Sequence, residues 1–143
     1  MPRRLLSPLL IPLALGLAGC SQPRVCTLIG ADSGVTVRWR SADFADAGPA
    51  TFRLCVRDTC EEHTLDVSQN EEGFLTLRLP DDIGAVTVPV RFTVTPIAGG
   101  QAVLDARANA RLKESHPNGE ECSFTVFQAG FRADRSKGLT SSY

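Results

Sequence analysis

Histidine and methionine are nearly absent from this chain of 143 residues, which has two histidines and a single methionine at its start. With so few imidazoles, few side chains are available for binding a transition metal or for transferring protons near neutral pH. An excess of one charge is also lacking, because 15 basic residues stand against 16 acidic ones and the formal net charge is −1. This balance gives no electrostatic reason to expect a nucleic-acid partner.

Long hydrophobic runs are lacking as well. The most apolar stretch, residues 5–17, is broken by Pro8 and Pro12 and is too short to span a bilayer comfortably. It follows Arg3 and Arg4 and precedes two small residues, which is the three-part layout of a secretory signal. The sequence therefore predicts an export leader, with ordinary secretion or an uncleaved anchor as the alternatives.

The leader ends in L-A-G-C, formed by Leu17, Ala18, Gly19 and Cys20. This stretch resembles the lipobox of bacterial lipoproteins, whose pattern of leucine, two small residues and cysteine it matches at every position. The resemblance implies that signal peptidase II removes residues 1–19 and that the sulfur of Cys20 carries a diacylglycerol. It also implies a protein anchored by lipid to the extracytoplasmic side of a bacterial cell membrane, with the bilayer as a partner. Two or three acyl chains hold such a protein essentially permanently.

Four cysteines remain once Cys20 is set aside, an even number that predicts two disulfides in an oxidising compartment. Residues 55–60 read C-V-R-D-T-C, and a turn at the two central residues would place Cys55 opposite Cys60 on a hairpin. Cys26 then pairs with Cys122, although three pairings are possible from sequence alone. No metal and no cofactor are expected, because this C-x4-C spacing stands without a second pair of ligands.

Apolar and polar residues alternate with a period of two along most of the mature chain, which predicts β-strands. Trp39 falls on the apolar face of one such strand and is expected in the core. In residues 102–113 alanines alternate with polar residues, and a strand sorts these two sets more cleanly than a helix does. Residues 25–29 are expected to form the first strand. Pro89 indicates an edge strand or a strand that begins just after it.

Seven or eight short strands with turns every eight to twelve residues predict an all-β fold, an antiparallel β-sandwich with two disulfides. In this general pattern residues 25–133 resemble small immunoglobulin-like and fibronectin-type domains, although the immunoglobulin order of Cys, Trp and Cys is missing. N-E-E-G at 70–73 is typical of a turn. Residues 20–24 would be the lipidated N-terminus and a short tether. Residues 134–143 lack periodicity and are expected to be a flexible tail.

The chain carries no recognisable catalytic motif. It has no glycine-rich phosphate loop and no nucleophile and base at a known spacing. We therefore interpret the domain as a non-enzymatic binding or structural module of the cell envelope, with an unknown envelope protein or ligand as its partner. The loop 41–49 is its expected binding loop, where Phe44 between Asp43 and Asp46 is either an exposed anchor or a tucked-in aromatic. The alternative is a small envelope enzyme, or a disulfide-braced protease inhibitor that presents residues 57–59.

Overall fold

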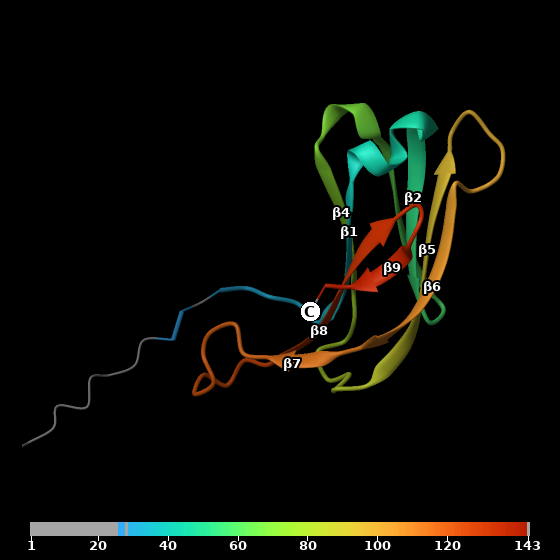
Figure 1. Cartoon of the computed structure of the whole chain (residues 1–143). Coiled ribbons are helices and arrows are strands. Elements are labelled where there is room, and N and C mark those ends of the chain that lie inside the picture. The colour runs from blue at the N-terminus through green and yellow to red at the C-terminus, as the bar shows by residue number, and fades with distance from the viewer. Residues whose placement is uncertain (1–25, 28, 143) are drawn as a thin grey trace, which may run out of the picture.

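The computed structural model describes residues 26, 27 and 29–142, and strands predominate in this part of the chain (Figure 1). No helix among these residues is long and apolar enough to cross a membrane. The elements in chain order are β1 (Gly34–Arg40), the 3-10 helix η1 (Ser41–Ala47), β2 (Pro49–Val56), β3 (Thr59–Asp66), the 3-10 helix η2 (Val67–Gln69), β4 (Glu72–Arg78), β5 (Thr87–Pro96), β6 (Leu104–Arg111), β7 (Lys113–Ser115), β8 (Val126–Asp134) and β9 (Gly138–Ser141).

The strands form two sheets, as expected for an all-β domain. Sheet A has the order β4-β1-β8-β7, with β9 also paired to β8, and sheet B has the order β3-β2-β5-β6. Strands β1 and β8 pair in parallel, with Gly34 opposite Gln128. The other pairs described are antiparallel. Sheet A is therefore mixed, and the prediction of a purely antiparallel fold is wrong for this one pair.

The core contains a cluster of four aromatic rings. Trp39 of β1 is buried, as predicted, and stacks on Phe52 of β2 with the ring centroids 4.3 Å apart. Phe44 of η1 meets Phe52 edge-on at 5.9 Å, and Phe92 of β5 lies 5.5 Å from Trp39. Since these rings come from both sheets and from η1, the cluster joins the main parts of the domain.

The alanine-rich segment after the β5–β6 turn is a strand, so that prediction is confirmed. In β6, Ala106 and Ala110 are buried and Arg107 is exposed, which is the sorting expected from a period of two. Strand β5 begins at Thr87, before Pro89, and lies between β2 and β6 in sheet B, so Pro89 marks neither an edge strand nor a strand start. The carbonyl of Pro89 accepts a hydrogen bond from the N–H of Arg57, which lies in the β2–β3 turn. The side of Pro89 that lacks an N–H therefore faces this turn, beyond the last paired residue of β2, and no ladder hydrogen bond is lost.

The first strand expected at 25–29 is not present among the described residues. Cys26, Thr27 and Ile29 are exposed and lie outside any strand. The backbone N–H of Ile29 instead donates a hydrogen bond to the side chain of Asn118 at 2.9 Å. The segment before β1 is therefore held to the β7–β8 connection by the side chain of Asn118 and not by backbone pairing with a strand.

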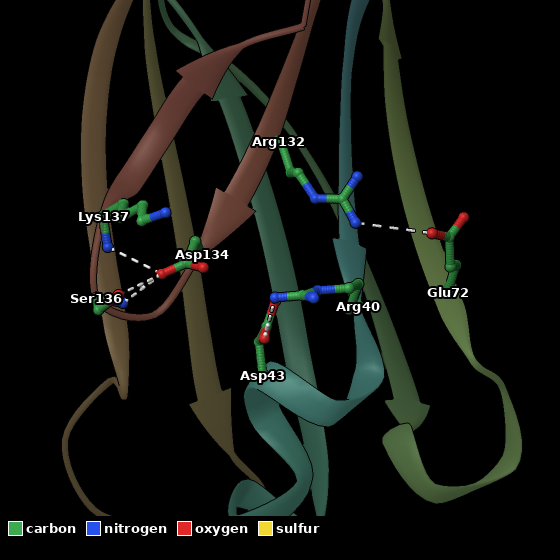
Figure 2. Close-up of polar contacts among 7 residues, drawn as sticks. All are labelled: Arg40, Asp43, Glu72, Arg132, Asp134, Ser136 and Lys137. Atoms are coloured by element: carbon green, nitrogen blue, oxygen red, sulfur yellow. Dashed lines mark hydrogen bonds and ion pairs between the residues drawn. The ribbon is translucent and has the colours of Figure 1, made fainter.

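Residues 138–141 form β9, so the flexible tail predicted at 134–143 is wrong over its described part. Figure 2 shows the cause, a turn organised by the carboxylate of Asp134. This carboxylate accepts hydrogen bonds from the backbone N–H groups of Ser136 and Lys137, at 2.8 and 3.0 Å. The turn returns the chain along β8 with Gly138 opposite Asp134. Turn chemistry, rather than hydrophobic periodicity, orders this segment.

Candidate functional site

Both predicted disulfides are present. Cys55 lies directly opposite Cys60 in the β2–β3 hairpin, as the two-residue turn requires. The second bridge joins Cys26 to Cys122, with 6.0 Å between their Cα atoms. This bridge ties the chain ahead of β1 to the connection between β7 and β8.

The loop predicted to bind a ligand is a structural element instead. Phe44 is completely buried, so the interpretation as an exposed anchor is wrong and the tucked-in alternative is correct. The seven-residue turn of η1 directs its ring onto Phe52. Asp43 accepts a bidentate hydrogen bond from Arg40 (Figure 2), and Asp46 pairs with Arg135. The hydrogen bond from Arg135 lowers the pKa of Asp46, so both carboxylates of this loop are engaged within the domain.

A broad depression of about 850 Å³ lies on the outer face of sheet B. It runs over β2, β5 and β6 and ends at the β2–β3 turn. Polar side chains line it because the alternation of each strand directs apolar residues to the core and polar ones outward. We call it the arginine groove, and its principal lining residues are Arg53, Cys55, Arg57, Asp58, Cys60, Pro89, Arg91, Thr93, Thr95, Asp105, Arg107 and Asn109.

Two arginines face each other across neighbouring strands in this groove. Arg91 of β5 is directly opposite Arg107 of β6, an arrangement in which like charges destabilise a sheet. Asp105 compensates Arg91 through two hydrogen bonds of 2.8 and 2.7 Å. These bonds lower the pKa of Asp105, and the charge of Arg107 contributes to the same shift. Asp105 is thus hydrogen-bonded to Arg91, while Arg107 acts on it through its charge alone.

The groove has more positive charge than its own carboxylates neutralise. Arg53 lies 3.9 Å from Glu62, whereas Arg57 and Arg107 form no ion pair with any described residue. Four arginines and two aspartates line the depression. The described part of the chain as a whole is acidic, with 16 acidic and 12 basic residues. The arginine groove is therefore a positive surface on a negatively charged domain.

Arg57 occupies an unfavourable backbone conformation. Its φ of 54° makes it the one non-glycine residue with positive φ among those described. Positive φ at the first central residue of a two-residue turn is the pattern of a type II′ turn, where glycine is preferred. A side chain in the left-handed region costs roughly 1–2 kcal/mol. The domain keeps an arginine at a position where glycine would be more stable.

A hydroxyl, an imidazole and a carboxylate line up near the start of β8. Thr125 Oγ1 lies 3.3 Å from His116 Nδ1, and Glu114 Oε1 lies 3.0 Å from His116 Nε2. This order is the one used by a nucleophile, a base and its orienting acid, and no sequence motif indicates it. None of these three residues lines the arginine groove. The chain of contacts instead braces β7 against the β7–β8 connection.

On the outer face of sheet A, two arginines contact side chains of strand β4. Arg132 of β8 reaches across β1 to Glu72 of β4, at 3.7 Å (Figure 2). Arg38 lies over the ring of Phe74, with its guanidinium carbon 5.7 Å from the ring centroid. No group of three or more histidine, cysteine, aspartate or glutamate residues is placed to hold a metal ion in the described ranges.

The turn that orders β9 should lose stability in acid. Hydrogen bonds from Ser136, first from its hydroxyl and then from its backbone, lower the pKa of Asp134 from 3.8 to about 2. A carboxylate with a depressed pKa in the folded state stabilises it above the unfolded pKa, and this contribution disappears as pH falls from about 4 to about 2. Asp134→Ala should therefore lower the thermal unfolding midpoint at pH 6 and have little effect at pH 2. Asp82→Ala, which removes an exposed carboxylate outside this turn, is the control, and an equal deficit at both pH values would contradict the prediction.

Comparisons with models of protein families, with curated proteins and with solved structures found no match for this chain.

Proposed function

We propose that this protein is a lipid-anchored protein of the bacterial envelope whose domain binds a ligand without catalysis. The observation that carries the proposal is the arginine groove, where Arg57 and Arg107 have no ion-pair partner among the described residues. Solvent-facing arginines that form no ion pair, gathered in a depression, suit recognition of an external anionic group. The two disulfides support an oxidising, extracytoplasmic location.

The proposed anchor rests on the sequence, because the lipobox residues Leu17, Ala18, Gly19 and Cys20 lie outside the described residues. The fold is compatible with this anchor. Cys26 follows Cys20 by six positions and is fixed by its disulfide to Cys122. The domain would therefore be held close to the bilayer, with the end that carries this disulfide nearest the lipid.

We further propose that the domain is a variant of the immunoglobulin-like sandwich. Sheet B, in the order β3-β2-β5-β6, corresponds to strands C′, C, F and G of that fold, and β4-β1 corresponds to E and B. Strand β8 takes the place beside B that strand A occupies in immunoglobulin domains, but it runs parallel to its neighbour. The tryptophan on β1 and the positions of both disulfides differ from the antibody pattern.

The anchor is tested by replacing the proposed lipid attachment site. Cys20→Ala should abolish acylation and leave the unprocessed precursor, or release the protein from membranes, because no sulfur remains to carry the diacylglycerol. Membrane fractionation and intact-mass measurement report the two effects. Ser21→Ala, which leaves the lipobox intact, should behave as the wild type. A wild-type protein without acyl mass, or an unchanged Cys20→Ala variant, would contradict the lipoprotein assignment.

The protease inhibitor remains the alternative function. Its reactive segment would be residues 57–59, which include the exposed Arg57. Arg57 and Asp58 form a two-residue hairpin turn and Thr59 pairs with Val56, so the segment is not an exposed extended loop, and the geometry supports this function less well than ligand binding in the groove. Stoichiometric inhibition of trypsin-like proteases that is lost in Arg57→Ala would favour the inhibitor.

A further inference from the structure

We infer that the arginine groove binds an extended acidic peptide segment, whose carboxylates pair with Arg57 and Arg107. This inference rests on the proposed use of the groove as a binding surface, and it is independent of the lipid anchor. The ligand class follows from three properties of the groove. These are the pairing of its arginines with carboxylates, the presence of two aspartates among the arginines, and its length along β5.

The groove already accepts carboxylates from its own chain. Arg91 holds Asp105 through two parallel hydrogen bonds, and Arg53 lies near Glu62. The planar guanidinium fork matches the two oxygens of a carboxylate, so the Arg91–Asp105 pair shows the geometry that a ligand side chain would adopt. Arg57 and Arg107 offer the same fork to groups from outside.

The remaining charges disfavour denser anions. Asp58 and Asp105 lie among the arginines and would repel closely spaced phosphates more strongly than carboxylates separated along a peptide. The lining also contains no aromatic side chain on which nucleic-acid bases would stack. An acidic peptide, with one charge per side chain and neutral amides between, fits this mixed surface better than a nucleic acid or a polyphosphate.

The length of the groove suits a short extended segment. From Pro89 to Thr95 the groove follows β5 for six residue steps, or about 20 Å in a strand. An extended peptide of about six residues covers the same distance. Thr93, Thr95 and Asn109 supply side-chain donors and acceptors for its backbone amides.

Direct binding to a defined probe tests the inference. The mature protein, purified in an uncharged detergent with its disulfides intact, is titrated into fluorescein-labelled hexaglutamate, hexaglutamine and polyphosphate. We expect saturable binding of hexaglutamate that weakens with added salt, and no binding of hexaglutamine. R57Q/R107Q should bind about tenfold more weakly, because two charge-assisted contacts at an exposed site are lost.

The matched control removes two arginines from the outer face of sheet A. R38Q/R132Q lowers the net charge by the same amount and should leave hexaglutamate binding unchanged. Equal weakening by both double variants would overturn the inference, because attraction would then depend on total charge. Tighter binding of polyphosphate, or no hexaglutamate binding by a protein that still fractionates with membranes, would overturn the ligand class and leave the anchor intact. Hexaglutamate binding by a protein without acyl mass would support the ligand class and overturn the lipid anchor.

A single substitution separates a binding role of Arg57 from a structural one. Arg57→Gly relieves the positive φ and should raise the melting temperature by about 4 °C, while it weakens hexaglutamate binding. A variant that is less stable and also binds less well would show that Arg57 acts by holding the turn, and would contradict its assignment as a ligand contact.

Discussion

Phe52→Ala is expected to lower the free energy of unfolding by about 3–5 kcal/mol, the range for aromatic truncation in a core. Phe52 is completely buried and contacts three other rings, those of Trp39, Phe44 and Phe92. Its removal leaves a cavity at the point where β1, β2, β5 and η1 meet. Strands β1, β2 and β5 are held in place by hydrogen bonds to their neighbouring strands, so the backbone cannot move in to fill the cavity. Chemical denaturation of the oxidised protein, followed by tryptophan fluorescence, measures the effect.

The control for this prediction is an exposed phenylalanine. Phe74 is 63% exposed and contacts Arg38, so Phe74→Ala should cost at most about 1 kcal/mol, mainly from the lost cation–π contact. If Phe52→Ala fails to fold, Phe52→Leu gives a smaller loss that is still measurable. Similar losses for Phe52→Leu and Phe74→Leu would contradict the central role of the aromatic cluster.

Gly73→Ala is expected to destabilise the domain by about 1–3 kcal/mol, the cost of inserting a methyl group into a filled core. A Cβ atom at this position would lie 2.3 Å from the indole ring of Trp39. The indole cannot move aside easily, because it is buried and stacked on Phe52. Thermal and chemical unfolding would both report the loss.

Gly30→Ala is the matched control for this substitution. A Cβ atom at Gly30 meets no atom within 4 Å and needs no positive φ, so this change should be neutral or slightly stabilising. A neutral Gly73→Ala would mean that the indole ring has room to shift. The role of Gly73 also corrects the sequence reading, because the turn predicted at 70–73 ends before it and Gly73 lies within β4.

Alternation allowed much of the fold to be predicted. The apolar face of β1 and the strand character of β6 both follow from a period of two, since the outward side chains there are arginines and other polar residues. The Cys55–Cys60 pairing was also predictable, because a two-residue turn fixes the hairpin register locally.

Features that depend on distant partners were not predictable. The same alternation fits parallel and antiparallel neighbours, so the parallel pairing of β1 with β8 left no local signal. Phe44 was open between two interpretations because a short 3-10 turn has no clear hydrophobic period. Residues 138–141 form a strand because the side chain of Asp134 caps the preceding turn. The segment is polar and has no hydrophobic period, so its sequence gives no sign of this strand.

The arginine groove was missed for a related reason. Its four arginines lie on β2, the following turn, β5 and β6, and none is near another in sequence except Arg53 and Arg57. Only the order of strands in sheet B brings Arg91 beside Arg107. The outward positions of the three strand arginines were predictable from alternation, but the convergence of all four required the register of three strands.

The parallel pairing of β1 with β8 also sets an order of folding. Since the chain is made from its N-terminus, β1 has one edge open until β8 exists, whereas the β2–β3 and β5–β6 hairpins have nearby partners. Such long-range closure is slow compared with hairpin formation. A chain interrupted before residue 126 would therefore expose β1 with one unpaired edge, which is open to aggregation.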